Sequence, residues 1–259
     1  MITFVGHASF LIQAGTTSLL TDPVYSDRAS PFRFAGPRRV RAPGVRFDAL
    51  PAISLVLLSH NHYDHCDLRT LGALDRRFAP RLVTPLGNGR LLRSAGIGQV
   101  EEIDWWQQAT SAPLPITLVP AQHFSARHLL DRNRALWGGF LIEAGGQRIL
   151  FAGDTGYGPH FREIGARLGP IDLALLPIGA YEPRWFMKDI HMNPAEAVQA
   201  HLDLAAGRSI AMHFGTFQLT PEGIDEPPRE LAKALGERGL PAEQFQAVEV
   251  GKSVSLVRR

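Results

Sequence analysis

Short apolar runs separated by turn-forming residues are the main pattern along this chain. The run 53–58 (ISLVLL) is almost continuously apolar, which is typical of a strand buried on both faces. Similar runs recur and are bounded by glycine, proline or small polar residues. We therefore expect strands at 2–5, 9–13, 17–21, 53–58, 81–84, 116–119, 139–144, 147–152, 171–176, 209–212 and 253–257.

Helical periodicity is rarer, and it predicts helices at about 67–78, 87–95, 160–168, 194–205 and 227–238. The helix at 194–205 has a clear start, because Asn193 can cap it, Pro194 suits its first position and Glu196 stands three residues after the cap. Strands come in runs followed by helices, and this order repeats after about residue 115. We expect one α/β domain over 1–259, with two similar strand-rich halves packed sheet against sheet.

The segment 22–52 is the longest irregular stretch, and it is rich in proline, glycine and arginine. A loop of this length inside a compact domain is usually functional or mobile.

The motif H-x-H-x-D-H follows the apolar run 53–58 directly and contains His60, His62, Asp64 and His65. In an extended segment, residues two apart point the same way, so His60 and His62 can bind one ion together. Asp64 and His65 follow as the chain turns towards helix 67–78, so they face another direction and can hold a second ion. Imidazole and carboxylate ligands favour zinc, with iron or manganese as alternatives. The competing interpretation is a histidine-rich surface loop.

Three later strands also end in a residue that can bind metal. His123, Asp154 and His213 each follow an apolar run, and the last two stand beside glycines that allow tight turns. Loops at the ends of rigid strands commonly carry functional groups. Together with the first motif, these residues predict a two-ion site.

Composition narrows the classes of function. The chain is 45% hydrophobic and 20% charged, as in ordinary soluble proteins, and its net charge of +2 argues against a dedicated nucleic-acid binder. The single cysteine, Cys66, excludes an internal disulfide framework and indicates a reducing compartment, and we interpret it as a small buried side chain. The sequence begins with strand-like residues and has no apolar run of about 20 residues, so we expect a cytoplasmic protein without a transmembrane segment.

These motifs resemble those of the metallo-β-lactamase superfamily. Within it, longer segments resemble the N-acylphosphatidylethanolamine-hydrolysing phospholipase D group, and the similarity extends over about residues 2–220. The segments are 6–11 (GHASFL), 21–31 (TDPVYSDRASP), 120–123 (PAQH), 131–134 (DRNR) and 176–187 (LPIGAYEPRWFM).

The resemblance implies a four-layer αββα sandwich with the site at one edge of its paired sheets. It also implies a ligand set in which Asp154 bridges two ions, with His60, His62 and His123 on one and Asp64, His65 and His213 on the other. The implied activity is that of a dinuclear hydrolase in which a metal-bridging hydroxide attacks a phosphodiester and Asp64 steers the proton.

Three further residues are candidates for supporting roles. Asp22 can orient a ligand histidine or simply form an Asp-Pro turn. His7 either lines or braces the site, or is a turn histidine. His191 matches a histidine near the active site of the phospholipase D group and is a candidate to bind phosphate or protonate the leaving group, with a structural role at a helix entrance as the alternative. Candidates for phosphate contact are Arg28, Arg38, Arg39, Arg127, Arg132 and Arg134.

The sequence is compatible with more than one class of substrate. We expect a small-molecule or phospholipid phosphodiester, with peripheral membrane contact as an option and no nucleic acid. The main alternative is a lactonase or another ester or amide hydrolase with the same ligands. A metal-binding protein without catalysis, and nucleic-acid processing, are weaker alternatives.

Overall fold

Two mixed β-sheets form the centre of the protein in the computed structural model, which describes residues 1–128 and 130–255. The first sheet has the order β13-β1-β2-β3-β4-β5-β6, and the second has the order β12-β11-β10-β9-β8-β7. The strands are β1 (Ile2–Gly6), β2 (Ser9–Ala14), β3 (Thr17–Thr21), β4 (Leu55–Leu57), β5 (Arg81–Pro85), β6 (Val100–Ile103), β7 (Ile116–Val119), β8 (Gly139–Ala144), β9 (Gln147–Phe151), β10 (Leu173–Pro177), β11 (Arg208–Met212), β12 (Phe245–Gln246) and β13 (Ser253–Val254).

Both sheets follow one pairing scheme. Strands β1, β2 and β3 pair antiparallel, and β3 to β6 then pair in parallel. In the second sheet β7, β8 and β9 pair antiparallel, and β9 to β12 pair in parallel. The structure therefore confirms two similar strand-rich halves, and in each sheet all strands of this scheme except β2 or β8 end at the same edge.

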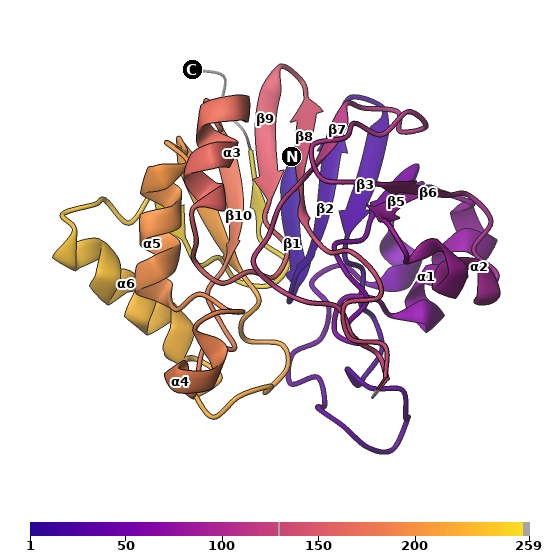
Figure 1. Ribbon diagram of the computed structural model, residues 1–259, viewed down its shortest axis with the longest axis horizontal. Coiled ribbons are helices and arrows are strands. Elements are labelled where there is room, and N and C mark those ends of the chain that lie inside the picture. Colours follow the sequence, from indigo (N-terminus) through magenta and orange to yellow (C-terminus); the bar gives the residue numbers. More distant parts are fainter. Residues whose placement is uncertain (129, 256–259) are drawn as a thin grey trace.

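Helices cover the outer faces of the paired sheets (Figure 1). Helices α1 (Leu68–Phe78) and α2 (Gly89–Ser94) lie on one side, and α3 (His160–Leu168), α5 (Pro194–Asp203) and α6 (Glu226–Glu237) lie on the other. The expected αββα sandwich is confirmed. Within the described residues, no helix is long and apolar enough to cross a membrane.

Strand β4 shows why its sequence is apolar at successive positions. Leu55 and Leu57 are fully buried in the core that contains residues of both sheets. Val56 and Leu58 are fully buried on the opposite face, in the cluster that also contains Leu74 of α1. Because successive side chains of a strand point to opposite faces, only a strand covered on both sides needs this pattern. The loop after β4 therefore starts from a rigid element.

Several boundaries differ from those expected. The strand predicted at 53–58 is limited to β4, and β6, β12 and the short helix α4 (Arg184–Met187) were not predicted. Residues 256 and 257 of the strand predicted at 253–257 lie outside the described residues. Segment 22–52 is irregular as expected and contains one short 3-10 helix, η1 (Phe47–Ala49).

Candidate metal centre

The predicted ligands meet at the edge where strands of both sheets end. His7 follows β1, Asp22 follows β3, and the four residues of the H-x-H-x-D-H motif follow β4. The second sheet contributes His123 after β7, Asp154 after β9 and His213 after β11. A backbone hydrogen bond of 2.9 Å from the His213 amide to the His7 carbonyl joins the two sheets at this point.

Three imidazoles form the first group of candidate ligands. His60 Nε2 lies 2.9 Å from His62 Nδ1, and His123 Nε2 lies 3.3 Å from the same atom. The three nitrogens lie within 4.8 Å of one another, as atoms around a single ion must.

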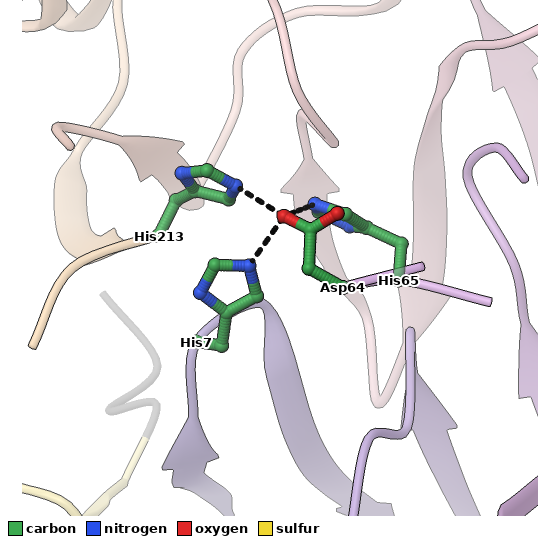
Figure 2. Close-up of side chains that lie close together, drawn as sticks. All are labelled: His7, Asp64, His65 and His213. Atoms are coloured by element: carbon green, nitrogen blue, oxygen red, sulfur yellow. Dashed lines mark hydrogen bonds and ion pairs between the residues drawn. The ribbon is translucent and has the colours of Figure 1, made fainter. Parts of the chain in front are cut away.

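The second group surrounds one oxygen of Asp64 (Figure 2). Asp64 Oδ2 lies 3.5 Å from His65 Nε2, 3.4 Å from His213 Nε2 and 3.0 Å from His7 Nε2. His7 thus lies in the turn after β1 and also contacts Asp64 directly, so the structure shows features of both roles that the sequence left open.

Asp154 lies between the two groups. Its Oδ2 is 3.0 Å from His65 Nε2 and 3.1 Å from His213 Nε2, and it is 3.9 Å from both His60 Nε2 and His123 Nε2. Ligands bound tetrahedrally at about 2.0–2.1 Å from zinc stand about 3.4 Å apart, so these separations fit metal coordination. Among the described residues, the buried nitrogens His65 Nε2 and His213 Nε2 and the buried oxygen Asp154 Oδ1 have no hydrogen-bond partner, which divalent cations would supply.

Residues 17–214 match the family model described as the beta-lactamase superfamily domain. The chain belongs to this superfamily. It is 46% identical over 239 residues to an uncharacterised protein of Mycobacterium tuberculosis, with 90% of this chain and 63% of that protein aligned. It is 38% identical over 264 residues to N-acyl-phosphatidylethanolamine-hydrolyzing phospholipase D 1 of Caenorhabditis elegans, with 96% of this chain and 74% of that protein aligned.

The superfamily fold is also seen among solved structures. A metallo hydrolase from the archaeon Ignicoccus hospitalis superposes with a TM-score of 0.71 at 22% identity, over 98% of this chain and 96% of that one. The similarity to the metallo-β-lactamase superfamily and to the phospholipase D group, expected from the motifs, is thus confirmed. The present chain spans under two thirds of the length of its mycobacterial relative.

Residues behind this superfamily site orient its imidazoles. Asp22 Oδ2 lies 2.6 Å from His65 Nδ1, so the proton of His65 is held on Nδ1 and its Nε2 faces the cluster. His123 Nδ1 donates to the carbonyl of Ile190 at 2.9 Å, which fixes that ring in the same way. The contact expected between Asp22 and a candidate ligand histidine is therefore present.

Ser59 is a supporting residue that the sequence did not single out. Its hydroxyl donates to Asp22 Oδ2 at 2.5 Å and lies 2.9 Å from His60 Nδ1, and its amide donates to Asp22 Oδ1 at 2.7 Å. Ser59 therefore ties Asp22 to the loop that carries the motif. The sequence signal that could have identified it is its position directly before His60.

Three site residues have left-handed backbone conformations. The φ angles are 57° for His7, 32° for Asp22 and 60° for His213. Positive φ is uncommon for residues other than glycine, and it concentrates at functional sites where the surrounding structure holds it in place. Here the strands end abruptly at these residues, which turns the side chains into the cluster.

The pKa shifts of the histidines differ between the two groups of candidate ligands. Burial and neighbouring imidazoles hold the pKa of His60 and of His123 well below the usual value, so both rings are neutral, as metal binding requires. Burial alone would also lower the pKa of His65, but the carboxylates of Asp154 and Asp64 raise it well above the usual range. For Asp154, burial would raise the pKa, but His213 and His65 hold it well below the usual value. In the second group, the carboxylates and His65 therefore stabilise each other's charged forms.

His191 lies against both groups. Its ring centroid is 5.0 Å from that of His123 and 5.2 Å from that of His213, and its buried Nδ1 has no hydrogen-bond partner in the part of the chain that the structure describes. Burial lowers the pKa of His191 to about 4, so the ring is neutral at pH 7. The structure places His191 at the cluster, and its role in turnover stays a prediction.

The remaining histidines and the cysteine lie elsewhere. His128 is exposed, His160 contacts the Thr155 hydroxyl, and His201 contacts the Ser209 hydroxyl. Cys66 is fully buried in the apolar cluster beneath α1, as the sequence indicated.

Proposed function

We propose that this chain is a dinuclear metal-dependent phosphodiesterase with phospholipase D-like activity. The observation that carries the proposal is the position of Asp154 Oδ2, within 3.9 Å of imidazole nitrogens from both groups of candidate ligands. A carboxylate in that position can be shared by two neighbouring cations.

The proposed ligand sets follow the two groups. His60, His62 and His123 would hold one ion, and Asp64, His65 and His213 the other, with Asp154 between them. Nitrogen and carboxylate ligands favour zinc, with iron or manganese as alternatives. When bound there, two divalent cations would supply Lewis acidity and lower the pKa of a water molecule so that it attacks at neutral pH.

Two side chains are suited to handle protons and substrate. The Asp64 side chain is 14% exposed and that of Asp154 only 2%, so Asp64 is the carboxylate that faces the open side and can accept a proton from the attacking water. His7 Nε2 holds Asp64 in place at 3.0 Å. His191, neutral and with a free ring nitrogen, would hydrogen-bond a phosphate oxygen or the leaving group.

The relationship to the nematode phospholipase D supports a phospholipid or a similar phosphodiester as the substrate. We treat residues 1–259 as one hydrolase domain, because one apolar core contains residues of both sheets. The single buried cysteine suits a cytoplasmic protein.

The test is hydrolysis of bis(p-nitrophenyl) phosphate beside a panel of simple lactones, with protein of measured metal content. We expect phosphodiester turnover that disappears in Asp154→Ala. The variant His191→Ala should keep its metal and lose turnover about 10²-fold or more, in the range of general acid–base contributions. Lactone cleavage without phosphodiester cleavage would replace the proposal with the lactonase alternative, and loss of metal in His191→Ala would contradict the role given to His191.

A further inference from the structure

A pocket lined by both polar and apolar side chains lies next to the loop that carries the metal motif. It has a volume of about 290 Å³, and its polar lining includes Ser26, Arg28, Ser30, Tyr63, Arg69 and Arg127. None of the candidate metal ligands lines it. The pocket is therefore a separate feature at the same end of the molecule.

Three guanidinium groups line this pocket without a carboxylate partner. In the part of the chain that the structure describes, the Arg69 side chain makes no hydrogen bond or ion pair, and the Arg28 side chain donates only to the Gly36 carbonyl, at 2.6 Å. Arg127 Nη1 donates to two carbonyls of the motif loop, at 2.8 and 2.9 Å, and its guanidinium stacks 4.0 Å from the centre of the Tyr63 ring. Arginines that are not neutralised by protein carboxylates are available to an anion.

The carboxylate in the pocket wall, Asp67, already has its partners. Its Oδ2 accepts from the Ser26 amide at 3.0 Å and from the Thr70 hydroxyl at 2.5 Å, and its Oδ1 accepts from the Arg69 amide at 3.2 Å. Three guanidinium groups and this one carboxylate leave the pocket with a positive charge. Planar guanidinium groups and nearby hydroxyls are the donors that phosphate prefers.

Exposed apolar side chains stand next to this pocket in the sequence and at the same end of the fold. Phe32 and Phe34 follow the lining residues Ser30 and Pro31, are 55% and 82% exposed, and have ring centroids 5.6 Å apart. Leu130, 85% exposed, comes two residues after the lining residue His128.

Helix α4 adds two more apolar side chains at this end. Its Trp185 and Phe186 are 86% and 62% exposed, and α4 projects from the same end of the sandwich as the loop after β3 (Figure 1). Large apolar side chains beside unpaired positive charge are typical of surfaces that enter the interface of an anionic membrane.

We propose that this pocket binds the phosphate of an anionic phospholipid and docks the protein on the membrane, with Phe32, Phe34 and Leu130 entering the interface. The segment 22–52 supports a lipid partner, because it carries six arginines against three aspartates. The site goes beyond the proposed hydrolysis, since docking requires no turnover. It would hold the metal centre at a bilayer surface while the pocket lipid remains uncleaved.

The test is co-sedimentation of the full metal-loaded chain with phosphatidylcholine vesicles that contain or lack phosphatidylglycerol. The pocket variant is Arg28→Ala/Arg69→Ala, which spares Arg127 and its contacts with the motif loop. The matched control is Arg81→Ala/Arg229→Ala, which removes the same charge from two exposed arginines outside the pocket. Metal content is measured for each protein to show that the site is intact.

We expect binding that depends on phosphatidylglycerol and falls about 30-fold in the pocket variant, since each arginine near an anionic surface contributes about fivefold. The control should bind like the unmodified protein, and Phe34→Ser should also weaken binding. Equal losses in the pocket variant and the control would overturn the proposal, as would unchanged binding of the pocket variant. Binding of inorganic phosphate at constant ionic strength, without vesicle binding, would overturn the lipid assignment. All of these results are independent of whether the protein cleaves a phosphodiester.

Discussion

At the residue scale, the candidate metal centre depends on buried side chains that lie behind its candidate ligands. Asp22 is fully buried and accepts hydrogen bonds from Ser59 and His65. Burial raises the pKa of Asp22, although these hydrogen bonds and the charge of His65 act in the opposite direction. The carboxylate is thus kept in place by partners that also orient two candidate ligands.

We expect Asp22→Asn to weaken metal binding about 10- to 100-fold, as is usual when the partner of a ligand histidine is changed. The amide no longer attracts the Nδ1 proton of His65, so the imidazole loses its fixed orientation. Competition with a chelator measures the effect. Asp48→Asn is the control, because the Asp48 side chain is 72% exposed and contacts Arg46. Unchanged metal affinity in Asp22→Asn would contradict the orienting role.

The buried residue His160 makes the stability of the protein depend on pH. Burial lowers the pKa of His160 from 6.5 to about 4. Between these values the unfolded chain binds a proton that the folded protein does not, so the free energy of unfolding falls as pH falls from 6.5 to 4, by up to about 3 kcal/mol. We expect urea denaturation to show that the free energy of unfolding of His160→Gln falls less steeply between pH 6.5 and 4 than that of the unmodified protein. His128→Gln, at an exposed position, is the control for removing a histidine.

At the element scale, the helix start at Asn193 was predicted in detail and is found. The Asn193 side chain accepts from the Glu196 amide at 2.8 Å, and the Glu196 side chain accepts from the Asn193 amide at 3.0 Å. Glu196 also accepts from Arg184 at 2.8 and 2.9 Å, and Arg184 donates to the His191 carbonyl at 2.9 Å. The cap therefore also fixes the segment that carries His191.

We expect Asn193→Ala to lower the free energy of unfolding by about 1 kcal/mol, because one amide of α5 loses its partner. For a domain of this size that corresponds to a decrease of roughly 2–4 °C in the midpoint of thermal unfolding. Asn193→Asp keeps an acceptor and should retain most of the stability. A similar decrease in both variants would show that the cap is not the cause.

Elements defined by local patterns were predictable, and those that depend on tertiary partners were not. Strand β6 has the sequence VEEI, and its two glutamates concealed it. In the structure Glu101 accepts from the Thr110 and Ser111 amides at 2.7 and 2.9 Å, and Glu102 accepts from the Gly87 and Gly89 amides at 2.8 and 2.9 Å. These hydrogen-bond partners lie many residues away in the sequence, so no local alternation of polar and apolar residues marks β6 as a strand.

At the scale of the whole molecule, the candidate ligands come from both sheets. The motif after β4 belongs to the first sheet, while His123, Asp154 and His213 follow strands of the second. The chemistry of each side chain was visible in the sequence, since each one ends an apolar run. The order of the strands in the two sheets determines which of these side chains meet, and it also brings His7 to Asp64. Strand order depends on tertiary contacts, so no local sequence pattern reveals it.

We expect chelation of bound metal to destabilise the entire protein, because the ions would cross-link the two sheets. With free metal at about 1,000 times its dissociation constant, binding contributes about 4 kcal/mol, which is roughly 8–16 °C in the unfolding midpoint. Scanning calorimetry with and without chelator measures this shift. Asp154→Ala should show a much smaller shift, and an unchanged midpoint in the unmodified protein would contradict a cross-linking role.

The matching strand schemes of the two sheets have a consequence for ancestry. In that scheme β7 corresponds to β1 and β9 corresponds to β3. His123 and His7 thus follow equivalent strands, and so do Asp154 and Asp22. Duplication of a half-length gene would produce such matching schemes. The two aspartates now differ in their contacts, since Asp154 lies between the candidate ligand groups while Asp22 contacts His65 from behind.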